Sequence, residues 1–115
     1  MKTVEEFNQE QRAIHNQVQE IRKEMHTVHV ALRGAEKFLR QLKEAASQST
    51  DAEFYKDEIA REEAAVARFS AKIDELKTHE EELEQKLIDL REEFKAESQA
   101  AIAEQQARLA AQQQG

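Results

Sequence analysis

The sequence predicts an all-α fold: an antiparallel coiled-coil hairpin of two long helices with a C-terminal helical extension. Three observations lead to this prediction. The 115 residues include two Gly, no Pro and no Cys, so the chain lacks the turn residues that connect strands. Charged residues make up 36% of the chain and hydrophobic residues 39%, which leaves little for a deep core. Apolar residues also recur at alternating steps of three and four over two long stretches.

The first helix is expected at about residues 3–46. Twelve of its thirteen heptad positions are apolar and only Gln11 is polar, so the period is 3.5 residues, as in a coiled coil. These positions are Val4, Phe7, Gln11, Ile14, Val18, Ile21, Met25, Val28, Leu32, Ala35, Leu39, Leu42 and Ala46.

The second helix is expected at about residues 51–94 and repeats the pattern. Ten of its twelve heptad positions are apolar, and the exceptions are Glu62 and Glu80. These positions are Tyr55, Ile59, Glu62, Val66, Phe69, Ile73, Leu76, Glu80, Leu83, Leu87, Leu90 and Phe94. We call the two sets of heptad positions together the seam.

A turn is expected at about residues 47–50, where four polar residues separate the two stretches. Thr50 precedes Glu53 by three residues, which is the spacing of a capping box at the start of a helix. Folding about this turn makes neighbours of residues such as Phe7 and Phe94. A single continuous helix is the alternative, because no Gly or Pro forces a break.

Two domains follow from this reading: the hairpin at 1–94 and an Ala- and Gln-rich helical tail at 95–115. Glu97, Glu104 and Arg108 occupy heptad positions after Phe94, so the hairpin core is expected to end there. The tail is either a docking helix, with Ile102 and Leu109 as its interface residues, or a frayed end.

Self-association is expected through apolar residues that lie outside the seam. Val30 and Phe38 on the first helix and Ala64 and Ala67 on the second are the predicted interface residues, since alanines let helices approach closely and an exposed Phe favours a covering partner. A dimer of hairpins that forms a four-helix bundle would cover them. The alternative is that the alanines only favour helix formation.

Charge is concentrated in the second helix and limits the expected partners. Residues 47–94 hold fifteen acidic and seven basic side chains, whereas residues 1–46 hold seven and eight. An acidic surface repels phosphates, so we expect no direct nucleic-acid or membrane binding, and an unidentified basic protein is a plausible partner.

No pattern of catalytic, cofactor or metal chemistry is found in the sequence. His26 and His29 are three residues apart but lie among Arg and Lys, and His79 with Glu75 and Glu82 is more typical of a solvated charge cluster. Neither Gly lies in a phosphate-binding loop. We therefore expect no enzyme and no cofactor.

The expected function is that of a non-enzymatic structural or adaptor protein that mediates protein-protein interaction through helix faces. The alternative is a small acidic inhibitor that mimics nucleic acid and blocks a protein that handles it. The N-terminus has no apolar segment typical of a signal peptide, and no apolar run is long enough to span a membrane, so a cytoplasmic location is expected.

Overall fold

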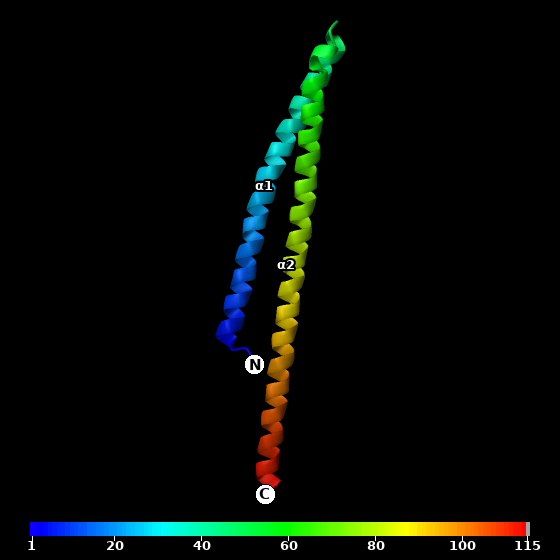
Figure 1. Ribbon diagram of the computed structural model, residues 1–115. Helices are drawn as coiled ribbons and strands as arrows, with labels where there is room; N and C mark the ends of the chain where they lie inside the picture. Colours follow the sequence, from blue (N-terminus) through cyan, green and yellow to red (C-terminus); the bar gives the residue numbers. More distant parts are fainter. Residues whose placement is uncertain (115) are drawn as a thin grey trace. The chain divides into compact units, whose positions relative to one another are not determined.

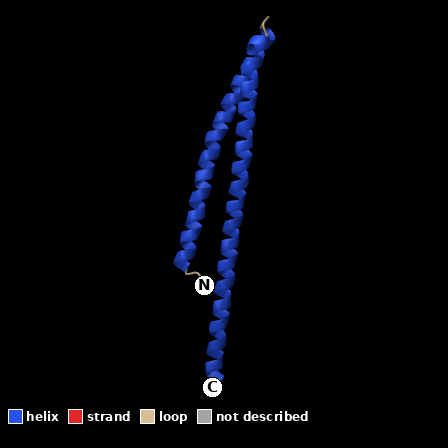
Figure 2. Cartoon of the chain, in the orientation of Figure 1, coloured by secondary structure: helices blue, strands red, loops and turns tan. Residues whose placement is uncertain are grey.

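The computed structural model describes residues 1–114, and all their secondary structure is helical. Helix α1 (Val4–Gln48) has 45 residues and helix α2 (Glu53–Gln114) has 62 (Figures 1 and 2). No strand occurs among the described residues. The prediction of an all-α chain with two long helices is confirmed, and the alternative of one continuous helix is wrong, because residues 49–52 interrupt it.

The turn lies two residues later than the sequence predicted. The Ser47 hydroxyl donates to the Glu44 carbonyl at 2.7 Å, a bond to the preceding turn of the helix, and α1 continues through Gln48. The Asp51 N–H then donates to the Ser49 hydroxyl at 3.0 Å. The described residues show no hydrogen bond between Thr50 and Glu53, so the capping box predicted there does not form, and Ser49 makes the side-chain bond of this turn instead.

The start of α1 is capped by the Thr3 side chain, which the heptad pattern did not reveal. The Glu6 N–H donates to the Thr3 hydroxyl at 3.1 Å, and that hydroxyl donates to Glu6 Oε1 at 3.1 Å. Together these bonds satisfy one of the free N–H groups at the helix start and orient the Glu6 carboxylate towards the positive end of the helix dipole.

The chain forms two compact units, each made of one stretch of α1 and one stretch of α2. In the unit Gln19–Glu80, ion pairs link the two helices. Their N–O distances are 3.6 Å for Lys43–Glu63, 3.8 Å for Lys72–Glu24 and 3.4 Å for Arg22–Glu80. Because residues later in α1 contact residues earlier in α2, the two stretches run in opposite directions within this unit.

The other unit joins Met1–Val18 to α2 from Glu81 onward. The rings of Phe7 and Phe94 stack with their centroids 4.2 Å apart and their planes at 11°. This contact confirms the predicted neighbourhood of the two residues.

The apolar interior coincides with the predicted seam. Ten hydrophobic side chains in the described chain are buried, and each occupies a seam position: Ile14, Val18, Ile21, Ala35, Leu42, Ile73, Leu76, Leu83, Leu87 and Leu90. No polar side chain among the described residues is buried with them. Each unit therefore has a narrow, wholly apolar interior formed where α1 and α2 meet.

Helix α2 continues without a break past Phe94. Glu97 and Ala101, which continue the heptad spacing, are still half-buried, and from Ile102 to Gln114 the residues are exposed. Burial therefore ends about two turns later than the predicted end of the core at Phe94. Lys2 lies near this stretch of α2, since the charges of Glu93 and Glu97 help to raise its pKa.

The Thr3 cap gives a direct test of how α1 begins. We expect Thr3→Ala to lower the free energy of unfolding by about 1 kcal/mol, because the Glu6 N–H loses its acceptor. Urea denaturation followed by circular dichroism measures this loss, and Thr3→Ser is the control that keeps the hydroxyl. Equal stability of Thr3→Ala and the parent chain would contradict this role.

Candidate interaction surface

Two polar seam positions, Gln11 and Glu80, each contact an arginine of the other helix. In the amide orientation that satisfies both groups, the Gln11 oxygen accepts bonds from Nε and Nη2 of Arg91, each at 2.8 Å. Glu80, 22% exposed, pairs with Arg22 Nε. Gln11 and Glu80, which interrupt the apolar pattern, thus make specific contacts between the helices of their own unit.

An acidic cluster surrounds the N-terminal lysine. Lys2 Nζ donates to Glu10 Oε2 at 2.7 Å. This hydrogen bond is the main reason that the pKa of Lys2 is raised above its usual value of 10.5, and the charges of Glu10, Glu93 and Glu97 raise it further. The bond to Glu10 ties the residues before α1 to the second and third turns of α1 itself.

All six predicted interface residues are exposed. Val30 is 55% exposed, Phe38 46%, Ile102 55% and Leu109 52%, and the alanines at 64 and 67 are also exposed. Exposure is necessary for contact with a second molecule. Whether one binds there stays a prediction.

Phe38 borders a shallow hollow of about 220 Å³ that Glu58, Arg61 and Glu62 also line. The ring therefore forms an apolar wall among charged side chains of α2. An apolar contact with a polar rim is the usual composition of a small protein interface. The sequence indicated Phe38, but the acidic and basic neighbours depend on how the helices align, which the heptad pattern alone does not fix.

The predicted interface residues near the turn do not all share one face. Ala67 follows Glu58 by about two and a half helical turns and therefore lies on the side of α2 opposite to the hollow. One partner helix that covers Phe38 would not contact Ala67. The six predicted residues therefore form more than one surface.

Gly34 lies in a row with Val30 and Phe38, since the three residues follow one another at steps of four on α1. A Cβ added at Gly34 would have no neighbour within 4 Å. Close packing inside the chain therefore gives no reason for a glycine at this position.

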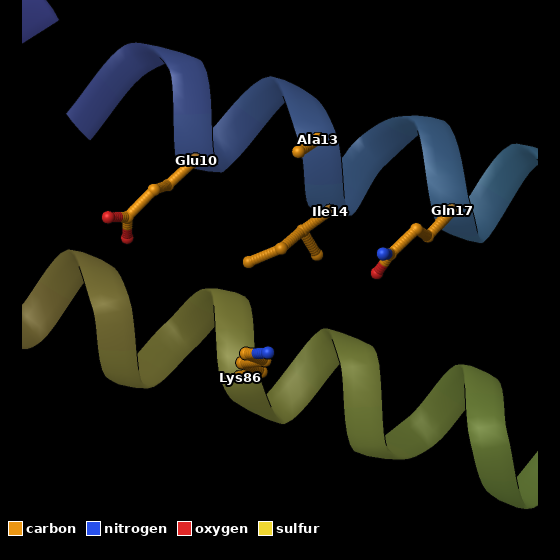
Figure 3. Close-up of a pocket in the computed structure, with 5 residues that line it drawn as sticks. All are labelled: Glu10, Ala13, Ile14, Gln17 and Lys86. Carbon is orange, nitrogen blue, oxygen red and sulfur yellow. The ribbon is translucent and has the colours of Figure 1, made fainter. Parts of the chain in front are cut away.

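Two further hollows lie in the unit that contains Met1–Val18. One, of about 210 Å³, is lined by Glu10, Ala13, Ile14 and Gln17 of α1 and by Lys86 of α2, and Figure 3 shows these side chains around the gap between the helices. The other, of about 260 Å³, is lined by Asn8, Gln11, Arg12 and His15. Both are shallow and lined mainly by flexible polar side chains, so neither has the enclosed apolar character of a small-molecule site.

The described part of the chain contains no candidate metal site. Within residues 1–114, no three His, Asp or Glu side chains lie together in a geometry suited to a metal ion. His26, His29 and His79, considered from the sequence, belong to no such group. None of the helices described has an apolar stretch suited to crossing a membrane.

Comparisons with known proteins give no relative from which a role could be transferred. No family model matches the chain, and neither the curated proteins nor the solved structures contain a match. Any statement about function therefore depends on the surfaces described above.

Substitution of Gly34 tests whether this position is free of close packing within the chain. We expect Gly34→Ala to raise the free energy of unfolding by about 1 kcal/mol, because alanine favours a helix interior and meets no neighbour in the chain. Thermal denaturation of dilute protein measures this gain. A lower melting temperature of Gly34→Ala than of the parent chain would contradict this expectation.

Proposed function

We propose that this protein is a non-enzymatic scaffold or adaptor that brings proteins together through exposed faces of an antiparallel coiled-coil hairpin. Burial of seam positions in each unit supports the coiled coil. The opposite directions of the paired stretches support the hairpin. Such a hairpin offers exposed helix faces and shallow hollows, which suits assembly better than catalysis.

The residue numbers of the contacting pairs support an antiparallel register within each unit. Folding about the turn pairs residues whose numbers sum to roughly 101, because successive residues on each helix rise by the same amount. The observed pairs, three in one unit and two in the other, fall near this value: Lys43–Glu63, Lys72–Glu24, Arg22–Glu80, Gln11–Arg91 and Phe7–Phe94.

We propose self-association through the surface formed by Phe38, Glu58, Arg61 and Glu62, which we call the Phe38 surface. The exposed ring of Phe38 beside the hollow is the observation that supports this proposal. A half-exposed phenylalanine gains on the order of 1–2 kcal/mol when a partner buries its remaining apolar area. Glu58 and Glu62 on the rim, with Arg61 between them, provide charges of both signs for a second copy. A dimer of hairpins in contact near Phe38 is the assembly that these features favour.

The acidic-inhibitor alternative receives less support from the charges. Lysines and arginines are interspersed among the acids of α2, and Lys72 lies 3.8 Å from both Glu24 and Glu75. A mimic of a phosphate backbone requires acids that remain unpaired at regular spacing. Ion pairs of this kind reduce the potential that would attract a basic groove.

The hairpin can be tested with cysteines, because the natural chain has none. We expect Phe7→Cys/Phe94→Cys to form a disulfide within one molecule on mild oxidation, since the two side chains face each other. Non-reducing electrophoresis then shows a monomer of altered mobility. Phe7→Cys/Leu83→Cys is the control within the same unit, with cysteines about three helical turns out of step. Disulfide-linked dimers from the first variant instead of monomers would contradict an intramolecular hairpin.

The Phe38 surface can be tested by a single charge. We expect Phe38→Asp to lower the molar mass measured by light scattering to that of one 13.3 kDa chain, with unchanged helicity by circular dichroism. Gln19→Asp introduces the same charge at an exposed position that does not line the hollow and should leave the mass unchanged. A parent chain that is already monomeric, or equal masses for parent and Phe38→Asp, would remove this interface.

A further inference from the structure

Helix α1 presents an uncharged stripe on the side that contains Phe38. Its residues recur at alternating steps of four and three, so they share one face of the helix. Each of them immediately precedes a seam residue, so the stripe is rotated by about 100° around the helix axis from the seam. We call these residues the α1 stripe: Thr27, Ala31, Gly34, Phe38, Gln41 and Ala45. All are exposed or half-buried, so the α1 stripe remains open to solvent in the single chain.

The opposite side of the seam on α1 is occupied by titratable side chains at the same levels of the helix. They follow seam residues by one position and recur at the same alternating steps: His26, His29, Arg33, Glu36, Arg40 and Lys43. A helix that met only water outside its seam would have charged and polar residues on both sides. The lack of charge on one side over about five turns therefore favours contact of that side with another protein surface.

Helix α2 continues this side of the unit Gln19–Glu80 with a mainly charged stripe. Its residues also precede seam residues by one position, and we call them the α2 stripe: Glu58, Arg61, Ala65, Arg68 and Lys72. Phe38 lines one hollow together with Glu58 and Arg61. Lys72 Nζ lies 3.8 Å from Oε1 of Glu24, which precedes Thr27 by three residues on the side of the α1 stripe. These two contacts place the stripes side by side, and together they form one face of this unit.

We infer that this face packs against the same face of a second copy of the chain, about a twofold axis that crosses α1 midway between Gly34 and Phe38. The inference depends on the proposed self-association at Phe38 and specifies its geometry. The two α1 helices run antiparallel, and Phe38 of each copy lies over Gly34 of the other. Gly34 provides space for the ring, because even an added Cβ would have no neighbour within 4 Å in the chain. A large residue opposite a small one satisfies the requirement that a twofold surface be complementary to itself.

The charges of α2 are complementary about the same axis. Facing residues in this unit have numbers that sum to roughly 101, so the axis crosses α2 near Ala65. Reversal about this level brings Glu58 of each copy level with Lys72 of the other. It also brings Glu62 level with Arg68. The packing of α1 and the charges of α2 therefore favour one and the same antiparallel alignment.

The face is large enough for a stable dimer. It is about 28 Å long over residues 27–45 and about 20 Å wide across two helices, so two copies bury on the order of 1,000 Å² in total, the lower limit for a specific interface. Because the stripes lie at roughly a right angle to the seam, each helix contacts one helix of its own chain and one of the second copy, as in a four-helix bundle. The two Lys37 side chains lie at the edge of this bundle, where water screens their repulsion.

Crosslinking between two different cysteine variants tests the antiparallel alignment, because the natural chain has no cysteine. Reversal about the axis brings Thr27 of one copy level with Ala45 of the other. Two residues at position 27, or two at position 45, are about 27 Å apart along the helices, which is beyond disulfide reach. We expect mild oxidation of an equimolar mixture of Thr27→Cys and Ala45→Cys to give covalent dimers about tenfold faster than oxidation of either variant alone, as measured by non-reducing electrophoresis. Equal rates would indicate parallel or random contact and would overturn the inference.

Exchange of Gly34 and Phe38 tests the packing of the ring. Gly34→Phe places a ring on both sides of the contact and should raise the dimer Kd, measured by sedimentation equilibrium, by about tenfold. The double variant Gly34→Phe/Phe38→Gly again opposes one ring to one glycine and should bring the Kd back to within about threefold of the parent value. Both positions are exposed, so circular dichroism should show unchanged helicity in each variant. A double variant that associates as weakly as Gly34→Phe would overturn this packing.

The outcomes separate this inference from the proposed function. A dimeric parent chain and a monomeric Phe38→Asp, measured by light scattering, would support the Phe38 surface as an interface. Failure of the mixed crosslink and of the exchange in such a dimer would refute only the alignment about Gly34. A parent chain that remains monomeric at about 1 mM would overturn both proposals.

Discussion

The mutual burial of the seam between α1 and α2 is the interaction on which the rest of the structure depends. Every buried hydrophobic residue in the described chain occupies a seam position, and no side chain there is fully enclosed. An isolated helix gains little stability from its own backbone bonds, so each helix needs its apolar face covered. Within each unit, the stretch of α1 covers the stretch of α2 and is covered by it. Exposed features such as Phe38 contribute little to this stability and are free to serve interaction.

Polar contacts in and around the seam select one alignment of the two helices among several that a regular apolar repeat would allow. A slip of one heptad preserves an apolar interior, so hydrophobic burial alone discriminates weakly between alignments. Such a slip would move Gln11 away from Arg91, Glu80 away from Arg22 and the Phe7 ring away from Phe94. Polar seam residues cost some stability relative to leucine. Their contacts form only in the observed alignment, so they favour it in free energy over an alignment slipped by one heptad.

The parts of the structure that the sequence predicted are those set by long repeats. Twenty-five seam positions determine the helices and their inner faces, so an error at a single residue does not change the prediction. The turn depends instead on a few local bonds, such as the Asp51 N–H to Ser49 hydroxyl bond, which a repeat does not reveal. The Thr3 cap carried a readable signal, a threonine three residues before a glutamate, which the heptad count did not examine. Exposure of Phe38 was predictable from its place outside the seam, whereas its hollow required the alignment of Glu58 and Arg61 on the other helix.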